Sequence, residues 1–254
     1  WAPGDQRIAV ARFDEAPVAT VTRAAIGADG TRVFEQRYPL AGTANVLIEL
    51  WITSPDGSNR VKVDLGQDRD IYLARVDWAP DGSALYVQRQ DRGQTRIDLL
   101  RADPATGKTT LVFSERAAPK SWVNLSDNYR FLKDGSILWW SERDGWAHYY
   151  RWNRGKWTQL TKGKWDAGHL VAVDQAKGSF VFEARADTVL ENQVWRASLN
   201  GPSKPVRLTE AGYDNAATAN GDASRVIVRR SNPSQPTQIY LADGAGKRLQ
   251  WVNE

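Results

Sequence analysis

The sequence predicts an all-β fold, a β-propeller segment of about five four-stranded antiparallel blades with the first blade truncated. A unit of turn, apolar strand and further short strands recurs along the chain, most clearly after Trp1-Ala-Pro-Gly-Asp and after Trp78-Ala-Pro-Asp-Gly. Asp-Gly and Asn-Gly dipeptides separate runs rich in Val, Ile, Leu, Tyr and Trp, which is the pattern of strands joined by tight turns. No segment keeps a helical apolar period for more than about two turns. Repeats of about 40–50 residues with roughly four strands each are typical of propeller blades.

The first blade is predicted to lack its innermost strand. Counting strands A to D outward from the propeller axis, residues 8–13 form strand B, residues near 45–52 form strand C, and residues 60–64 form strand D. The connection from B to C, residues 14–44, is long and is predicted to hold an extra hairpin around Asp29-Gly30.

The other four blades are each predicted to carry all four strands, joined by Asp-Gly turns of type I′. No linker or low-complexity tract interrupts the series, so residues 1–254 are predicted to be part of one propeller domain without a catalytic domain. In the order A, B, C, D, we expect strands at 72–78, 84–89, 96–102 and 109–113; at 129–132, 137–141, 147–152 and 157–161; at 170–173, 180–184, 193–197 and 205–208; and at 216–219, 225–229, 238–241 and 248–252.

The composition argues against several classes of function. The chain of 254 residues has no Cys, which excludes a disulfide, a thiolate metal site and a cysteine nucleophile. Its net charge of +4 comes from Lys and Arg spread among acidic neighbours, which argues against nucleic-acid binding. No apolar run approaches the roughly 20 residues of a membrane-spanning helix. The chain has no Met and opens on Trp1 within a strand-turn pattern, so we expect it to be part of a longer protein.

Residues that carry chemistry are sparse. There is no Gly-x-Ser-x-Gly nucleophile motif and no His-Glu-x-x-His zinc motif. The two histidines are expected to be structural, His148 packed or hydrogen-bonded within a strand and His169 on the surface at a turn. Asp64, Asp68 and Asp70 lack the glycine and glutamate spacing of a calcium loop. We therefore expect no metal, no cofactor and no catalytic residue in this chain.

Six strings of residues resemble one known family. Trp1-Ala-Pro-Gly-Asp-Gln-Arg-Ile-Ala-Val-Ala-Arg-Phe-Asp-Glu resembles the pattern W-S-P-D-G…I-A-x-x-x-F-D/N-E of the dipeptidyl peptidase IV family, and Tyr38-Pro-Leu-Ala-Gly-Thr-Ala-Asn45 is similar to its Y-P-K-A-G-x-x-N. Four further strings match in order and spacing: Asp70-Ile-Tyr-Leu-Ala-Arg-Val-Asp-Trp78, Ser121-Trp-Val-Asn124, Ser141-Glu-Arg-Asp-Gly145 and Leu160-Thr-Lys-Gly-Lys-Trp165. The resemblance covers essentially the whole chain.

The resemblance implies an eight-bladed propeller that caps an α/β-hydrolase domain. In that family the hydrolase carries Ser, Asp and His and removes dipeptides after Pro or Ala from free N-termini. The paired Glu that binds the substrate amine lies upstream of the motif at Trp1, and the hydrolase lies downstream, so no catalytic residue is carried over. Three departures from the family pattern stand out: Leu40 replaces its Lys, Trp146-Ala147-His148 replaces its aromatic-Arg-His string, and residues 124–127 stand where the mammalian enzyme has basic and aromatic residues near an extended subsite.

The resemblance favours one function over a second that stays open. The first is a propeller that walls the substrate cavity of a bacterial serine peptidase, periplasmic or secreted, and filters access for peptides with a free N-terminus. Its partners are then its own C-terminal hydrolase domain and peptide substrates, with a second copy in a homodimer. The alternative is a stand-alone propeller that binds a protein partner, because fold alone does not separate the two.

A substrate-facing rim follows from the strand order. In an antiparallel blade the D-to-A and B-to-C connections leave at the same end, and the family's paired Glu lies in a D-to-A connection. Trp122 and Trp165 are candidates to line a peptide channel, and blade-to-blade packing is the alternative for each. The predicted rim residues are Asn45, Asp70, Tyr72, Trp122, Asn124, Asp127, Arg143 and Trp165.

Overall fold

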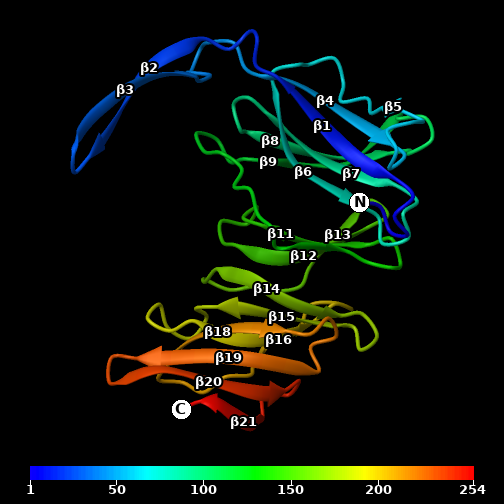
Figure 1. Cartoon of the computed structure of the whole chain (residues 1–254). Helices are drawn as coiled ribbons and strands as arrows, with labels where there is room; N and C mark the ends of the chain where they lie inside the picture. The colour runs from blue at the N-terminus through cyan, green and yellow to red at the C-terminus, as the bar shows by residue number, and fades with distance from the viewer. The chain divides into compact units, whose positions relative to one another are not determined.

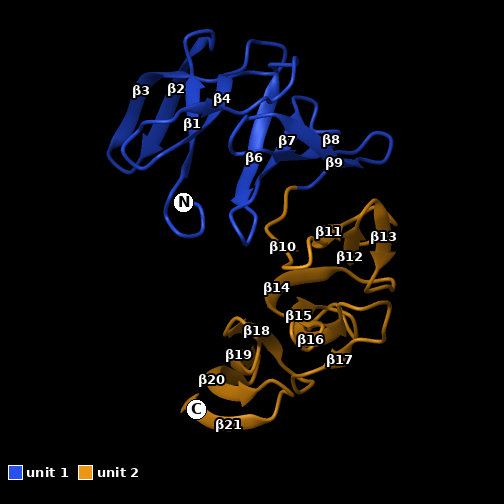
Figure 2. Cartoon of the chain, turned by 90° about the vertical axis from the view of Figure 1, so that its right-hand side faces the viewer, with its two compact units in different colours: residues 1–124 blue, residues 125–254 orange.

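The computed structural model describes residues 1–254 and contains 21 β-strands and no helix (Figure 1). The chain divides into two compact units, residues 1–124 and residues 125–254 (Figure 2). The strands form one three-stranded sheet, four four-stranded sheets and one two-stranded sheet, each antiparallel. The predicted all-β class is therefore confirmed.

The first unit begins with the truncated blade. Strands β1 (Ile8–Asp14), β4 (Leu47–Thr53) and β5 (Val61–Lys62) form a three-stranded sheet in the order β1-β4-β5, so β1 lies at its edge. Between β1 and β4, strands β2 (Thr20–Gly27) and β3 (Gly30–Arg37) form the separate two-stranded hairpin that the sequence predicts around Asp29-Gly30.

Four complete blades follow, and each matches the prediction to within a few residues. The first unit holds one of them, and the second unit holds three. The strands in sheet order are β6 (Ile71–Trp78), β7 (Leu85–Asp91), β8 (Arg96–Ala102) and β9 (Thr109–Arg116); β10 (Tyr129–Phe131), β11 (Ile137–Ser141), β12 (His148–Asn153) and β13 (Lys156–Gln159); β14 (Ala167–Asp174), β15 (Ser179–Ala184), β16 (Gln193–Ser198) and β17 (Val206–Arg207); and β18 (Asp214–Ala219), β19 (Arg225–Asn232), β20 (Gln235–Asp243) and β21 (Arg248–Asn253).

The Asp-Gly dipeptides do form turns, but the type I′ prediction is wrong for those that join the strands within the blades. A type I′ turn needs positive φ at both central residues. At Asp56-Gly57, Asp81-Gly82 and Asp134-Gly135, only the glycine has positive φ, at 82°, 72° and 80°. Each aspartate instead accepts a hydrogen bond at its Oδ1 from the backbone N–H two residues later. Such a carboxylate stabilises a turn with one left-handed glycine, which dipeptide composition alone does not distinguish from type I′.

Apolar side chains pack between neighbouring blades. In the first unit, Leu50 and Ile52 of β4 pack with Leu85 and Val87 of β7. In the second unit, Phe180 and Phe182 lie in the cluster between its first two blades, while Val181 and Val194 lie in the cluster between its last two. Because successive side chains of a strand point to opposite faces, the middle blade of this unit is apolar on both faces.

The turn between β8 and β9 fits tightly against the first blade. Gly107 has a φ of +71°, and its carbonyl oxygen accepts a hydrogen bond from Asp64 N at 2.9 Å. A Cβ at this position would lie 1.9 Å from the carbonyl oxygen of Lys62. Only glycine therefore allows the turn to approach β5 this closely.

We expect Gly107→Ala to lower the free energy of unfolding by about 1–3 kcal/mol more than a matched glycine change, because backbone must move to relieve the clash. Gly4→Ala is the control, since Gly4 also has positive φ, at 80°, but a Cβ added there would meet nothing within 4 Å. Urea unfolding of both variants measures the difference. Equal losses of stability would show that the approach of Gly107 to Lys62 does not matter.

A buried ion pair fixes the second sheet to the connection before it. Asp98 on β8 has a side chain only 6% exposed, and its Oδ2 lies 2.7 Å from Nη2 of Arg89 and 3.3 Å from Nε of Arg96. Ser114 Oγ donates to Oδ1 at 2.6 Å, and Arg89 also donates to the Leu65 carbonyl oxygen at 2.6 Å. Burial raises the pKa of Asp98, but the hydrogen bonds and the two guanidinium charges outweigh it and hold the pKa below its ordinary value of 3.8.

We expect Asp98→Asn to lower the free energy of unfolding at pH 7 by about 3 kcal/mol, because Arg89 loses its buried counter-charge. Since the folded-state pKa is depressed, this stabilisation is present above pH 3.8 and is lost as the pH falls through the lower folded-state value. Urea unfolding at pH 7 and at more acidic pH tests both statements. Asp5→Asn, in an exposed turn, is the control. A wild-type advantage that persists undiminished at strongly acidic pH would contradict the role of this carboxylate.

Candidate functional site

Two sets of connections meet at one end of each blade. We call this end the BC rim: it is where the second strand of a sheet connects to the third and where the fourth connects to the next sheet. In the sheet β6-β7-β8-β9, Val123 N donates to the Gln94 carbonyl at 2.8 Å and Ala117 N donates to the Thr95 carbonyl at 2.9 Å. The connection after β9 therefore lies against the loop between β7 and β8. Within this blade, the B-to-C connection and the D-to-A connection therefore lie at the same end, as the strand order predicts.

In the first unit, the side chain of one predicted rim residue, Asn45, supports the backbone. Asn45 is 6% exposed, its Nδ2 donates to the Ile71 carbonyl at 3.2 Å, and its Oδ1 accepts from Val46 N at 2.9 Å. It joins the end of the long β1–β4 connection to the start of β6. Asp70 is exposed, and its backbone N–H donates to Asp68 Oδ1 at 3.0 Å.

Arg92 is a rim residue that the sequence does not reveal. Its Nη2 donates to the carbonyls of Pro39 and Leu40 at 3.0 and 3.2 Å, and its guanidinium carbon lies 5.7 Å from the centre of the Tyr72 ring. Arg92 thus ties the segment 38–45 to the second sheet beside Tyr72. In the sequence it stands next to Asp91, and nothing local distinguishes it from a solvated surface charge.

Trp122 is not used for packing between blades. Its side chain is 64% exposed, and its Nε1 donates to Asn124 Oδ1 at 3.1 Å. This hydrogen bond orients the indole, and most of the residue remains exposed. Asn124 is the last residue of the first unit, and Asp127, also exposed, belongs to the second.

In the second unit, Trp165 packs between two neighbouring blades, and Arg143 contacts its own blade. The Trp165 ring stacks on Phe182 with centroids 6.2 Å apart and meets the His148 ring edge-on at 4.8 Å, beside the core cluster. The Arg143 guanidinium lies 3.8 Å from the centre of the Trp157 ring, and its Nε donates to Ser141 Oγ at 2.9 Å. Packing is therefore the observed role of Trp165, and Arg143 lies across an aromatic ring of its own sheet.

His148 is packed and hydrogen-bonded within a strand, as the sequence predicts. His148 is fully buried, its Nε2 donates to the Gly163 carbonyl at 3.0 Å, and its Nδ1 lies 3.1 Å from Thr161 Oγ1. His169 is exposed, but it lies in β14 at an irregular register rather than in a turn. Neither imidazole is placed beside a serine in the hydrogen bonds of the structure.

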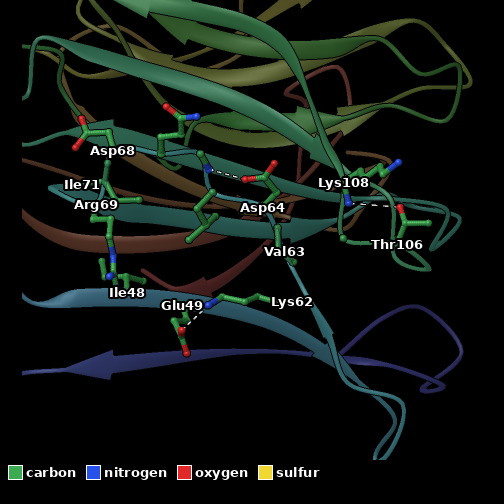
Figure 3. Close-up of a pocket in the computed structure, with 14 residues that line it drawn as sticks. Ile48, Glu49, Lys62, Val63, Asp64, Asp68, Arg69, Ile71, Thr106 and Lys108 are labelled. Atoms are coloured by element: carbon green, nitrogen blue, oxygen red, sulfur yellow. Dashed lines mark hydrogen bonds and ion pairs between the residues drawn. The ribbon is translucent and has the colours of Figure 1, made fainter.

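A cavity of about 530 Å³ lies beside β5, and its charged side chains are shown in Figure 3. Lys62 forms an ion pair with Glu49, and the hydrogen bonds from Lys62 and Arg12 lower the pKa of Glu49 to about 2. Asp64 Oδ1 accepts from Gly66 N at 2.9 Å. Its charged groups are of mixed sign, and Lys62 and Glu49 pair with each other, so the cavity defines no single ligand chemistry. These groups are Glu49, Lys62, Asp64, Asp68, Arg69 and Lys108.

No group of three or more His, Asp or Glu side chains is arranged to hold a metal ion. Asp64 and Asp68 each accept a hydrogen bond from a backbone N–H group of their own connection. No helix long and apolar enough to span a membrane is present.

The chain is similar to dipeptidyl peptidases along nearly its whole length. The structure of Porphyromonas gingivalis dipeptidyl peptidase 4 superposes with a TM-score of 0.87 at 22% identity, covering 100% of this chain and 36% of that one. A structure from Bacteroides ovatus, described as a dipeptidyl aminopeptidase IV, gives a TM-score of 0.82 at 23% identity, covering 99% and 39%. These likenesses show the fold, and they confirm the β-propeller architecture.

Curated relatives show the same similarity to dipeptidyl peptidases. Dipeptidyl peptidase 4 of Trichophyton equinum is 24% identical over 99% of this chain and 35% of its own length, and dipeptidyl peptidase 8 of Mus musculus is 22% identical over 92% and 34%. The chain thus spans about a third of the length of the curated relatives it matches. The family described as the dipeptidyl peptidase IV N-terminal region matches residues 1–237. The chain belongs to this family, as the motifs in the sequence predict.

Proposed function

We propose that this chain is the propeller region of a dipeptidyl-peptidase-IV-like serine peptidase, where it walls the substrate cavity and admits peptides with a free N-terminus. The observation that carries the proposal is the family match over residues 1–237. The relatives are about three times as long as this chain, which leaves room for a C-terminal hydrolase domain that performs the chemistry.

The BC rim supplies two kinds of residue for such a wall. Trp122 offers an exposed aromatic face on which a proline ring or a peptide backbone can stack, with Asn124 hydrogen-bonded beside it. Asn45, Arg143 and Trp165 hold the connections and blades in position. The remaining rim residues proposed to face the substrate are Asp70, Tyr72 and Asp127.

The physical role of this wall is positioning and exclusion of water. A propeller without a nucleophile accelerates hydrolysis only by limiting which peptides enter and by orienting them toward groups elsewhere. A stand-alone protein-binding propeller is the competing function, and it finds less support because the similar proteins named above are all dipeptidyl peptidases or aminopeptidases.

Two further aspects belong to the same proposal. We place the parent protein in the periplasm or outside a bacterial cell; the bacterial source of both similar structures supports the bacterial part of this assignment. A homodimer is also proposed, because the hairpin β2–β3 leaves Ile26 and Val33 exposed at 85% and 64% and pairs with no other strand.

The direct test expresses the parent open reading frame and measures release of p-nitroaniline from Gly-Pro and Ala-Pro substrates. We expect the full-length protein to turn over both and the chain 1–254 alone to turn over neither. The full-length protein with its predicted nucleophilic serine changed to alanine is the control. A folded full-length protein that hydrolyses neither substrate would favour the protein-binding alternative.

We expect Trp122→Ala in the full-length protein to raise KM for longer peptides by about fivefold to tenfold, the value of one aromatic stacking contact. In this proposal Trp122 contacts only the distal part of a longer peptide, so dipeptide chromogens should be hydrolysed as before. Because the side chain is 64% exposed, the melting temperature should not change. Steady-state kinetics with both substrate lengths provide the measurement.

Trp165→Ala is the matched comparison. Since Trp165 packs on Phe182 and His148, its loss should reduce the free energy of unfolding by about 2–4 kcal/mol and alter kinetics for long and short substrates alike. If the two tryptophan variants behaved identically in stability and kinetics, the separation of a ligand-facing from a packing tryptophan would be wrong.

A further inference from the structure

The two Asn-Gly dipeptides of the chain, Asn200-Gly201 and Asn220-Gly221, lie in comparable places. Both asparagines are exposed, and both lie in turns at the end of the blades opposite the BC rim, between β16 and β17 and between β18 and β19. Neither glycine donates its backbone N–H group to an acceptor. The two turns are therefore alike in the exposure of the asparagine and in the freedom of the glycine nitrogen.

An Asn-Gly pair can react without an enzyme or a cofactor. The backbone nitrogen of the glycine attacks Cγ of the asparagine, the new C–N bond closes a succinimide ring, and ammonia leaves with the proton of that nitrogen. Water then opens the ring at either carbonyl and yields aspartate or isoaspartate, so water is the only co-reactant. Glycine favours the attack because it has no side chain beside the nitrogen. The amide must first rotate toward that nitrogen, so hydrogen bonds that fix the amide slow the reaction.

The side chain of Asn220 is fixed within its own turn. Its Nδ2 donates to Ser224 Oγ at 2.8 Å, and its Oδ1 accepts from Arg225 N at 2.9 Å. The same turn holds the Asp222 carboxylate, whose Oδ1 accepts from Ser224 N at 3.0 Å. This carboxylate disfavours the negative charge that develops as the nitrogen of Gly221 loses its proton. Hydrogen bonds and charge therefore both oppose succinimide formation at Asn220.

The side chain of Asn200 forms no hydrogen bond. Its backbone is anchored, since Asn200 N donates to Ser198 Oγ at 3.0 Å. The amide lies against the backbone of a neighbouring turn, because a Cβ built on Gly178 would lie 2.4 Å from Asn200 Nδ2. Such a van der Waals contact resists rotation less than two hydrogen bonds do. The amide of Asn200 is therefore freer to turn toward Gly201 N than that of Asn220 is toward its own glycine.

Asn200 also lines a cavity of about 340 Å³ whose charged side chains sum to a positive charge. Lys133 and Arg151 contribute two cations to the lining, and Asp134 contributes one carboxylate. Arg151 pairs with Asp134 and donates from Nη1 to the Leu199 carbonyl at 3.1 Å, while the exposed Lys133 forms no ion pair. These cations stabilise the negative charge that develops during ring closure and the carboxylate that the reaction leaves.

We propose that Asn200-Gly201 is a site of spontaneous deamidation, where Gly201 N displaces ammonia from Asn200 and the product carboxylate lies beside Lys133 in the lining of the cavity. Asn220-Gly221 is protected by the hydrogen bonds of its amide. The inference rests on these contacts alone and holds whether or not the parent protein is a peptidase. Because β17 (Val206–Arg207) has only two residues, the modified turn leaves the three inner strands of its blade intact.

The test incubates the freshly purified full-length parent protein at neutral and at mildly alkaline pH and follows both sites by peptide mapping with mass spectrometry. Labelling by protein isoaspartate methyltransferase identifies the isoaspartate product. We expect the acid form to accumulate about tenfold faster at position 200 than at position 220, a factor of the size that the hydrogen bonds of Asn220 supply. The rate at position 200 should rise with pH, because the attacking nitrogen must lose its proton.

The same protein unfolded in guanidinium chloride is the control. Without the fold, both Asn-Gly pairs should deamidate at similar rates. Equal rates at the two positions in the folded protein would overturn the inference, as would an amide at position 200 that stays intact until the protein is unfolded. A preference for position 200 that is equally large in the unfolded protein would overturn it too, since the difference would then come from the local sequence.

Two variants test the contacts separately, and in each the other site is the internal control. Ser224→Ala removes the acceptor of Asn220 Nδ2 and should raise the rate at position 220 several-fold without changing position 200. Lys133→Gln removes the unpaired cation and should lower the rate at position 200 several-fold without changing position 220. An unchanged rate at position 220 in the first variant would contradict protection by the hydrogen bond. An unchanged rate at position 200 in the second would contradict the role of the cavity.

Discussion

The packing of apolar blade faces against each other is the interaction on which the rest of this structure depends. Phe180 and Phe182 point to one neighbour and Val181 and Val194 to the other, so a single sheet contributes to two core clusters. Alternation of side chains along a strand makes this arrangement possible, and it requires that strand pairing not slip by one residue. The connections at the blade ends bury less apolar surface than the strands do, so they can carry polar and exposed side chains.

Much of the fold is predictable because these constraints are local. Period-two apolar runs and Asp-Gly dipeptides locate all four strands in each complete blade, and the hairpin β2–β3 follows from the same signals. The turn type is not predictable from the dipeptide, since Asp134 stabilises its turn by accepting a hydrogen bond rather than by adopting positive φ. That choice depends on the residues on both sides of the turn.

The rim is harder to predict, because its side chains depend on contacts distant in sequence. Trp122 and Trp165 each lie in a connection between the fourth strand of one sheet and the first strand of the next. Trp122 is nevertheless exposed, whereas Trp165 stacks on Phe182. Arg92 gains its role from carbonyls more than fifty residues earlier, at Pro39 and Leu40. Strand order brings these connections to one end of each blade, but only three-dimensional packing decides which side chains remain available to a ligand.

The blades thus support the BC rim, and the BC rim carries the proposed function. The most direct test of these two roles is an experimental structure of the full-length parent protein with a bound peptide. We expect the peptide and the catalytic serine to lie on the side of the BC rim, with Trp122 nearer to the peptide than Trp165. A structure in which the connections of the opposite end, such as the β8–β9 turn at Gly107, face the catalytic serine would contradict this division of roles.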